Sequence, residues 1–160
     1  MLILSHLVMF LLAAATQRAW PEVLRVGTMA PDLVLVLVAC IGITRGPVAG
    51  YAAGLLGGLL SATTSQGPFG TILLSHMAVG FLAGQARGKV FVDHILAAPI
   101  VAALATCLAA VIQLVVDPPP AFLPWVGQLG IAILYNALIS PLSYVYARAV
   151  SQRWPARAEA

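Results

Sequence analysis

The residues of this chain that are best suited to chemistry are three histidines, five carboxylates and two cysteines. Ser75 and His76 are neighbours, and a hydroxyl beside an imidazole is one requirement for nucleophilic catalysis. Adjacent helical residues point to different faces, however, and the sequence offers no acid to orient the base. We therefore expect no nucleophile at Ser75.

His76 permits two interpretations. It precedes Gly80 by one helical turn, so the two residues share a helix face. As a functional group, His76 would be a ligand or a pH-sensing group at a helix interface. As a structural group, it would be a neutral histidine that is hydrogen-bonded to a neighbouring helix, and we favour this role.

The carboxylates lie at or beyond the ends of the apolar segments, and they are Glu22, Asp32, Asp93, Asp117 and Glu159. Proton-coupled pumps and intramembrane proteases need ionisable groups at mid-membrane. No two carboxylates fall one helical turn apart for general acid and base catalysis. Asp32 follows Pro31 at the start of an apolar segment, which favours simple helix capping. The chain is therefore predicted not to be an enzyme.

The cysteines and glycines give no cofactor or metal site. Cys40 and Cys107 stand in separate apolar segments without a CxxC motif, so we interpret both as small buried hydrophobes. The glycine-rich stretch lacks the Lys and Ser/Thr that would complete a phosphate loop. We expect no cofactor and no metal.

The elements that carry these residues are apolar helices. Of the 160 residues, 61% are hydrophobic and 8% are charged, which predicts an integral membrane protein of all-α class. Six candidate spans cover residues 1–15, 29–44, 47–62, 69–86, 95–116 and 124–146. The second and third are short, at about 24 Å against a hydrocarbon core of about 30 Å, so they are either short spans or a hairpin that stops before the far face. We predict a six-helix transmembrane bundle as one domain over 1–150, with a short basic tail at 151–160.

The basic residues predict the orientation. Six lie on the side of both termini, namely Arg45, Arg87, Lys89, Arg148, Arg153 and Arg157. Only Arg18 and Arg25 lie on the other side, so the positive-inside rule places both termini in the cytoplasm. The bases are spread over short loops and form no stripe for nucleic acid. Residues 117–124, DPPPAFLP, predict a stiff extended connector on the outside.

Glycines at a spacing of four form two rows. Gly46, Gly50, Gly54 and Gly58 make the first row, which Ala62 extends, and the second row follows His76 as Gly80, Gly84 and Gly88. Helices in lipid associate through close backbone approach, which small residues allow. We expect the third segment to pack on the fourth. The alternative is that one row receives the membrane helix of a partner.

Asn136 is the clearest buried amide, and it lies in the last segment. We expect it to hydrogen-bond to another helix for about 1 kcal/mol. A role in a binding site is the alternative, because polar groups inside bundles often mark pockets. Pro141 is expected to kink the same helix.

The order of these features resembles the rod shape-determining protein MreD family. The motifs are PDLVLVLVA near the start of the second segment, then TRGP, then GLLSATTSQGPFG, then a last helix ending in YNALISPLSYVYAR. The similarity is strongest over residues 31–84 and 135–148. Family members carry an Asp four residues after the Gly of the GLL motif, where this chain has Ala62.

The resemblance implies a multi-pass protein of the bacterial plasma membrane. It would be a non-enzymatic scaffold of the rod complex, which controls cell shape and peptidoglycan synthesis. The implied direct partner is the membrane-anchored MreC, and through it MreB, RodA and a class B penicillin-binding protein. The basic cytoplasmic edge would face filaments or anionic lipid of the bilayer.

An alternative from another class is the substrate-binding S subunit of an energy-coupling-factor vitamin transporter, which is also a small six-helix protein. Such subunits often dock their coupling partner through an Ala-x-x-x-Ala seam, and Ala15 and Ala19 have that spacing. A transporter subunit also needs polar and aromatic side chains that converge on an external pocket. The outer loops of this chain provide mainly Pro, Thr and Ser, which disfavours this alternative and leaves open whether the bundle encloses a ligand cavity.

Overall fold

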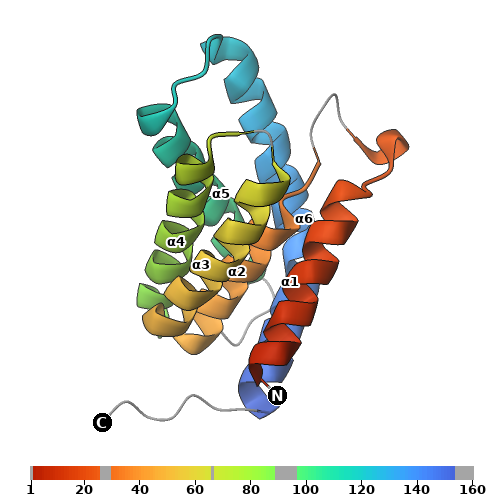
Figure 1. Ribbon diagram of the computed structural model, residues 1–160, viewed down its shortest axis with the longest axis vertical. Helices are drawn as coiled ribbons and strands as arrows, with labels where there is room; N and C mark the ends of the chain where they lie inside the picture. Colours follow the sequence, from red (N-terminus) through yellow and green to blue (C-terminus); the bar gives the residue numbers. More distant parts are fainter. Residues whose placement is uncertain (1, 26–29, 66, 89–96, 154–160) are drawn as a thin grey trace.

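The computed structural model describes residues 2–25, 30–65, 67–88 and 97–153. Within these ranges the chain is all helical, with no strand (Figure 1). The helices are α1 (Leu2–Arg18), the 3-10 turn η1 (Glu22–Leu24), α2 (Leu33–Arg45), α3 (Pro47–Thr64), α4 (Phe69–Gln85), α5 (Ala97–Val116) and α6 (Phe122–Arg153). The last helix is longer than the expected 124–146 at both ends, so Pro124 belongs to α6 and the predicted tail begins inside the helix.

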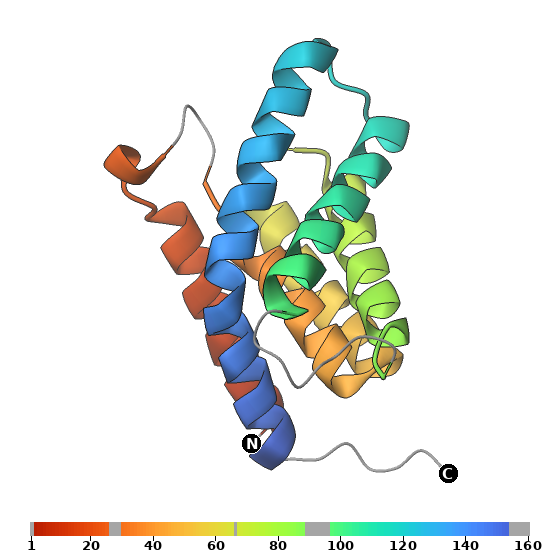
Figure 2. The same ribbon diagram turned by 180° about the vertical axis from the view of Figure 1, so that it is seen from behind.

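Successive helices run up and down the bundle. α1 begins, and α6 ends, at the same end of the molecule (Figure 1). Seen from behind, α5 and α6 lie side by side, and α6 is the longest element (Figure 2). The described basic residues are divided between the two ends of the bundle. Arg45 and Arg153 are the last residues of their helices and lie at the end where α1 starts, whereas Arg18 closes α1 at the opposite end. Lys89 and Arg157 lie outside the described residues.

α2 is the centre of the bundle and contacts each of the other five α-helices. Its residues from Val34 to Thr44 are all buried. This explains why PDLVLVLVA is a continuous apolar run without helical periodicity, since every face of the helix meets protein. α1 is attached more loosely, with Leu4, Leu11 and Leu12 at least half exposed, and its Phe10 is buried in the core.

Local chemistry sets both ends of α2. Asp32 is the N-cap, and its Oδ1 accepts a hydrogen bond from the Leu35 N–H at 3.0 Å. The predicted capping role of Asp32 is therefore confirmed. At the other end, Gly46 has φ +97°, a left-handed value that favours glycine, and Pro47 starts α3 directly afterwards. Gly46 thus lies at the break between α2 and α3 and is not a member of a helical row.

α3 and α4 pack with their backbones in contact. A Cβ placed on Gly50 would overlap the carbonyl of Gly80, and one placed on Gly54 would lie 2.7 Å from Met77 Cα. A Cβ placed on Gly58 would lie 3.1 Å from the Cβ of His76. The expected packing of the third segment on the fourth is observed. The row from Gly50 to Gly58 is therefore buried in the contact between α3 and α4.

The prediction that Gly80, Gly84 and Gly88 form a second packing row is only partly correct. Gly84 does pack, since a Cβ on it would lie 2.5 Å from the carbonyl carbon of Gly46. Gly88 lies beyond the end of α4 at Gln85, has φ +80° and has nothing within 4 Å of an added Cβ. The sequence spacing suggested a helix that continues to Gly88, but the chain leaves the helix first. Gly88 therefore belongs to a turn and not to the seam.

α6 continues through Pro141, whose missing N–H leaves the carbonyl of Ala137 without its helical donor. Ser140 supplies a replacement, because its Oγ donates to that carbonyl at 2.7 Å. Ser140→Ala should therefore lower the free energy of unfolding by about 1 kcal/mol. In a Pro141→Ala background the backbone donor is restored, so the same substitution should cost almost nothing. Thermal unfolding of the four variants measures this coupling, and equal losses in both backgrounds would contradict it.

Two helices, Ala97–Val116 and Phe122–Arg153, are long and apolar enough to cross a membrane. Leu33–Arg45 and Phe69–Gln85 are shorter apolar helices. α2 has 13 residues, a length of about 20 Å. Asp117 to Ala121 join α5 to α6 without regular structure. Cys40 and Cys107 are both free, and Cys40 is fully buried as expected.

Candidate functional site

The short central helix leaves a cavity at its N-terminal end. α2 has 13 residues and α5 and α6 have 20 and 32, so its neighbours extend past Asp32 and enclose a space of about 400 Å³. The walls come from α1, α3, α4, α5 and α6 as well as from the start of α2. The lining is rich in polar groups, which are Gln17, Asp32, Ser61, Ser65, Thr71, Ser75, His76, Thr106, Gln113, Gln128 and Asn136, together with Trp125.

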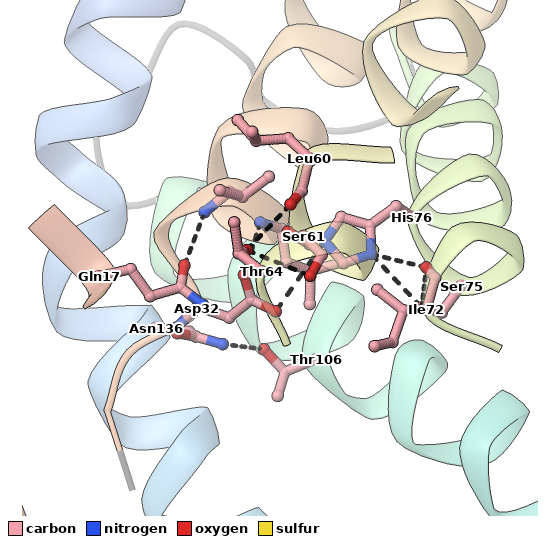
Figure 3. Close-up of polar contacts among 12 residues, drawn as sticks. Gln17, Asp32, Leu60, Ser61, Thr64, Ile72, Ser75, His76, Thr106 and Asn136 are labelled. Carbon is pink, nitrogen blue, oxygen red and sulfur yellow. Dashed lines mark hydrogen bonds and ion pairs between the residues drawn. The ribbon is translucent and has the colours of Figure 1, made fainter. Parts of the chain in front are cut away.

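Asn136 ties three helices together at the floor of this cavity (Figure 3). Its Oδ1 accepts a hydrogen bond from the Asp32 N–H at 2.8 Å. Its Nδ2 donates to Thr106 Oγ1 at 2.9 Å, and the threonine hydroxyl donates in turn to the Ala102 carbonyl at 2.8 Å. The backbone donor fixes which way the amide points. The expected bond from Asn136 to another helix is confirmed, and the residue also lines the cavity.

His76 is buried, with 3% of its surface exposed, and its two ring nitrogens differ. Nδ1 lies 2.9 Å from the Ile72 carbonyl of the same helix. A carbonyl only accepts, so Nδ1 carries the proton, and in the neutral ring Nε2 is an acceptor. The expected hydrogen bond from His76 to a neighbouring helix is wrong, because the partner lies one turn back on α4.

The other nitrogen of His76 faces Asp32, with 4.0 Å between Nε2 and Oδ2 (Figure 3). The sequence placed Asp32 at the edge of the apolar region because it starts a segment. α2 is so short, however, that this start lies level with Thr106, which is halfway along α5. His76 is likewise at the middle of α4. An ionisable pair thus occupies the middle depth of the bundle, although Asp32 lies at the end of its own apolar segment as expected.

The pair does not form a nucleophilic site with Ser75. The Ser75 hydroxyl donates to the Ile72 carbonyl at 2.8 Å, and Nδ1 of His76 donates to the same oxygen. Nδ1 therefore has no lone pair to accept the serine proton. Within the described residues no group of three His, Cys, Asp or Glu side chains is placed to hold a metal. The arrangement suits binding rather than proton transfer to a nucleophile.

Two buried polar atoms of the cavity wall have no hydrogen-bond partner among the described residues. They are His76 Nε2 and the Ser61 hydroxyl, and Ser61 is 4% exposed. A buried polar group without a partner costs about 1 to 3 kcal/mol. That both line one cavity points to a group that completes their hydrogen bonds there.

Sequence reasoning located some of these residues and missed their grouping. Asn136, His76 and Asp32 were identified singly, and Gly42, whose added Cβ would lie 2.6 Å from the Gly80 carbonyl, was missed. The sequence left open whether the bundle contains a pocket, and the polar groups that line the cavity come mostly from the helices rather than from the outer loops. The available signal was the short second segment, which leaves space beside longer neighbours. Ala62 is buried in the last turn of α3.

No protein-family model, curated protein or solved structure matches this chain. The resemblance to the MreD family therefore rests on the sequence motifs alone.

Proposed function

We propose that this chain is an MreD-type scaffold of the bacterial plasma membrane, a non-enzymatic subunit of the rod complex that governs cell shape and peptidoglycan synthesis. Its direct partner would be MreC, with MreB, RodA and a class B penicillin-binding protein in the same assembly. All six α-helices would cross the bilayer, with both termini in the cytoplasm and α2 enclosed by the others.

The observation that supports this proposal is the contact between two of the family-like motifs. Asp32 of PDLVLVLVA donates its N–H to Asn136 of YNALISPL at 2.8 Å, across 104 residues of sequence. A third motif, GLLSATTSQGPFG, forms the reversal from α3 to α4, whose rows of glycine pack together.

The packing also limits where a partner helix docks. Gly50, Gly54 and Gly80 lie against backbone or side chains of this same chain, so these glycines offer no seam to MreC. The perimeter is available instead, since Leu134, Leu138 and Leu142 of α6 are each at least 66% exposed. We place the MreC contact on the perimeter helices.

Co-purification tests this proposal. The full chain, extracted in detergent, should carry MreC with it, and deletion of its gene should turn rods into rounded cells. If MreC is absent from the purified material and cell shape is unchanged by deletion, the scaffold proposal is wrong. A matched variant set, with Leu138→Ala on α6 beside Leu104→Ala on α5, reports which perimeter helix MreC uses, because both leucines are well exposed.

Ala62→Asp introduces the acid that the resemblance implies at this position. Ala62 is buried in the last turn of α3, where the negative end of the helix dipole opposes a carboxylate. We expect the variant to lose about 1 kcal/mol of stability in thermal unfolding. Improved recovery of MreC with this variant would instead identify Ala62 as a lost partner contact.

A second candidate is the S subunit of an energy-coupling-factor vitamin transporter, and the polar cavity favours it. The proposed docking seam does not, because α1 ends at Arg18 and Ala19 lies beyond the helix. Adjacent genes for MreB and MreC support the scaffold, whereas adjacent genes for a pair of ATPases support transport. ATP-dependent vitamin uptake with such ATPases would rank this candidate first.

A further inference from the structure

The proposed scaffold function gives no role to the cavity at the N-terminus of α2. A partner helix would dock on the perimeter of the bundle, whereas this cavity lies in its interior. We propose that this cavity binds a primary ammonium group, carried by a small organic amine or by the headgroup of an aminolipid, with Asp32, His76 and Ser61 as its direct hydrogen-bond acceptors.

The spacing of the acceptors points to a bridging donor. Asp32 Oδ1 is occupied by the Leu35 N–H, whereas Oδ2 faces His76 Nε2 at 4.0 Å. That distance is too long for a hydrogen bond between the two side chains. A group that donates to both at about 2.8 Å fits between two such acceptors.

A third acceptor completes the geometry of an ammonium group. Ser61, on α3, lines the same cavity as His76 and Asp32, and its hydroxyl is buried without a hydrogen-bond partner among the described residues. An ammonium group has three N–H donors, and the carboxylate, the imidazole nitrogen and the hydroxyl oxygen provide one acceptor each. The three side chains come from α2, α4 and α3, so the site exists only in the assembled fold.

The charge of the lining selects a cation. Asp32 is the acidic side chain of the described lining, which contains no lysine or arginine. An anionic ligand would be repelled by the Asp32 carboxylate in a partly desolvated space, which is unfavourable. Trp125 also lines the cavity, and an indole face attracts cations and stacks on rings. A volume of about 400 Å³ accepts a molecule with a single ring.

Three probes that differ only in the head group test the charge preference. The full chain in detergent is titrated with phenethylamine, 2-phenylethanol and phenylacetate, and binding is measured by calorimetry. We expect phenethylamine to bind at least about tenfold more tightly than the alcohol, because it adds a charge-assisted hydrogen bond. Phenylacetate should bind most weakly. Equal affinity for amine and acid, or no binding of the amine at millimolar concentration, would overturn the proposal.

Asp32→Asn is the decisive variant, because asparagine keeps the N-cap acceptor for Leu35 and removes the charge. It should lose at least about tenfold in affinity for phenethylamine and little for 2-phenylethanol. Asp117→Asn makes the same change outside the cavity and should bind like the parent chain. If Asp32→Asn does not fold, Ser61→Ala replaces it, with a loss of several-fold for the amine. Unchanged amine affinity in the folded variant would refute the assignment.

Nanodiscs distinguish the two sources of the ammonium group. If an aminolipid headgroup fills the cavity, phenethylamine binds more weakly in discs of phosphatidylethanolamine than in discs of phosphatidylcholine, which is also zwitterionic but has no N–H donor. If the natural ligand is a free amine, the two affinities agree. Both outcomes support an ammonium site, whereas absence of amine binding in both lipids rules it out, and none of them depends on MreC.

Discussion

Replacing Gly50 by valine should lower the free energy of unfolding by about 3 kcal/mol or more. A Cβ at Gly50 would overlap the carbonyl of Gly80, and the obstructing atoms are backbone, which cannot move aside by changing a rotamer. α3 and α4 would have to separate, and they would lose the close contact that holds helices together in lipid. Thermal unfolding of the purified chain in detergent, followed by circular dichroism, measures the loss.

Gly130→Ala is the matched control for this substitution. Gly130 lies within α6, and an added Cβ there has nothing within 4 Å. Alanine favours the helix over glycine by about 0.5 to 1 kcal/mol, so this variant should be slightly more stable. A Gly50→Val variant as stable as the parent chain would show that α3 and α4 do not pack in this way.

Asn136→Leu should cost about 2 kcal/mol, the second largest effect we expect. The substitution removes an acceptor from the Asp32 N–H and a donor from Thr106, both of which the buried amide satisfies. Leucine has the same branched heavy-atom skeleton as asparagine but bulkier methyl groups, so the loss combines hydrogen bonding with a packing cost at this buried site. Chemical unfolding in detergent gives the value.

Thr106→Val separates the two bonds of Asn136. The coupling between the two substitutions in a double-mutant cycle isolates the Asn136–Thr106 bond, for which we expect about 0.5 to 1 kcal/mol. The remaining cost of Asn136→Leu then combines the lost acceptor of the Asp32 N–H with the packing of the larger leucine side chain. An additive cycle would contradict the bond between the two side chains, and a silent Asn136→Leu would contradict the whole network.

Much of the fold could be predicted from the sequence. Runs of apolar residues predicted the helices. Glycines at a spacing of four predicted the contact between α3 and α4, because residues at that spacing lie on one face of a helix. The errors lie at helix ends. Gly46 and Gly88 match the spacing, yet both have left-handed φ and lie outside helices. Spacing alone does not reveal where a helix stops.

The candidate site was less predictable, because it depends on depth. Asp32 begins its own helix, and the sequence places such a residue at the membrane edge. The depth of Asp32 depends instead on the register of α2 against α5 and α6. That register is set by side chains more than 70 residues away in the sequence, as in the contact of Asp32 with Asn136. The pairing of Asp32 with His76 follows from that register and leaves no local signal.

The enclosed position of α2 also separates the site from the surrounding bilayer. In the proposed membrane setting no lipid touches α2, so its length of about 20 Å need not match the hydrocarbon thickness. Hydrophobic mismatch in a thinner or thicker membrane would tilt α1, α5 and α6 at the perimeter. The glycine-packed interior would keep Asp32 and His76 at a constant separation. A short helix at the centre thus allows one site geometry to persist across membranes of different lipid composition.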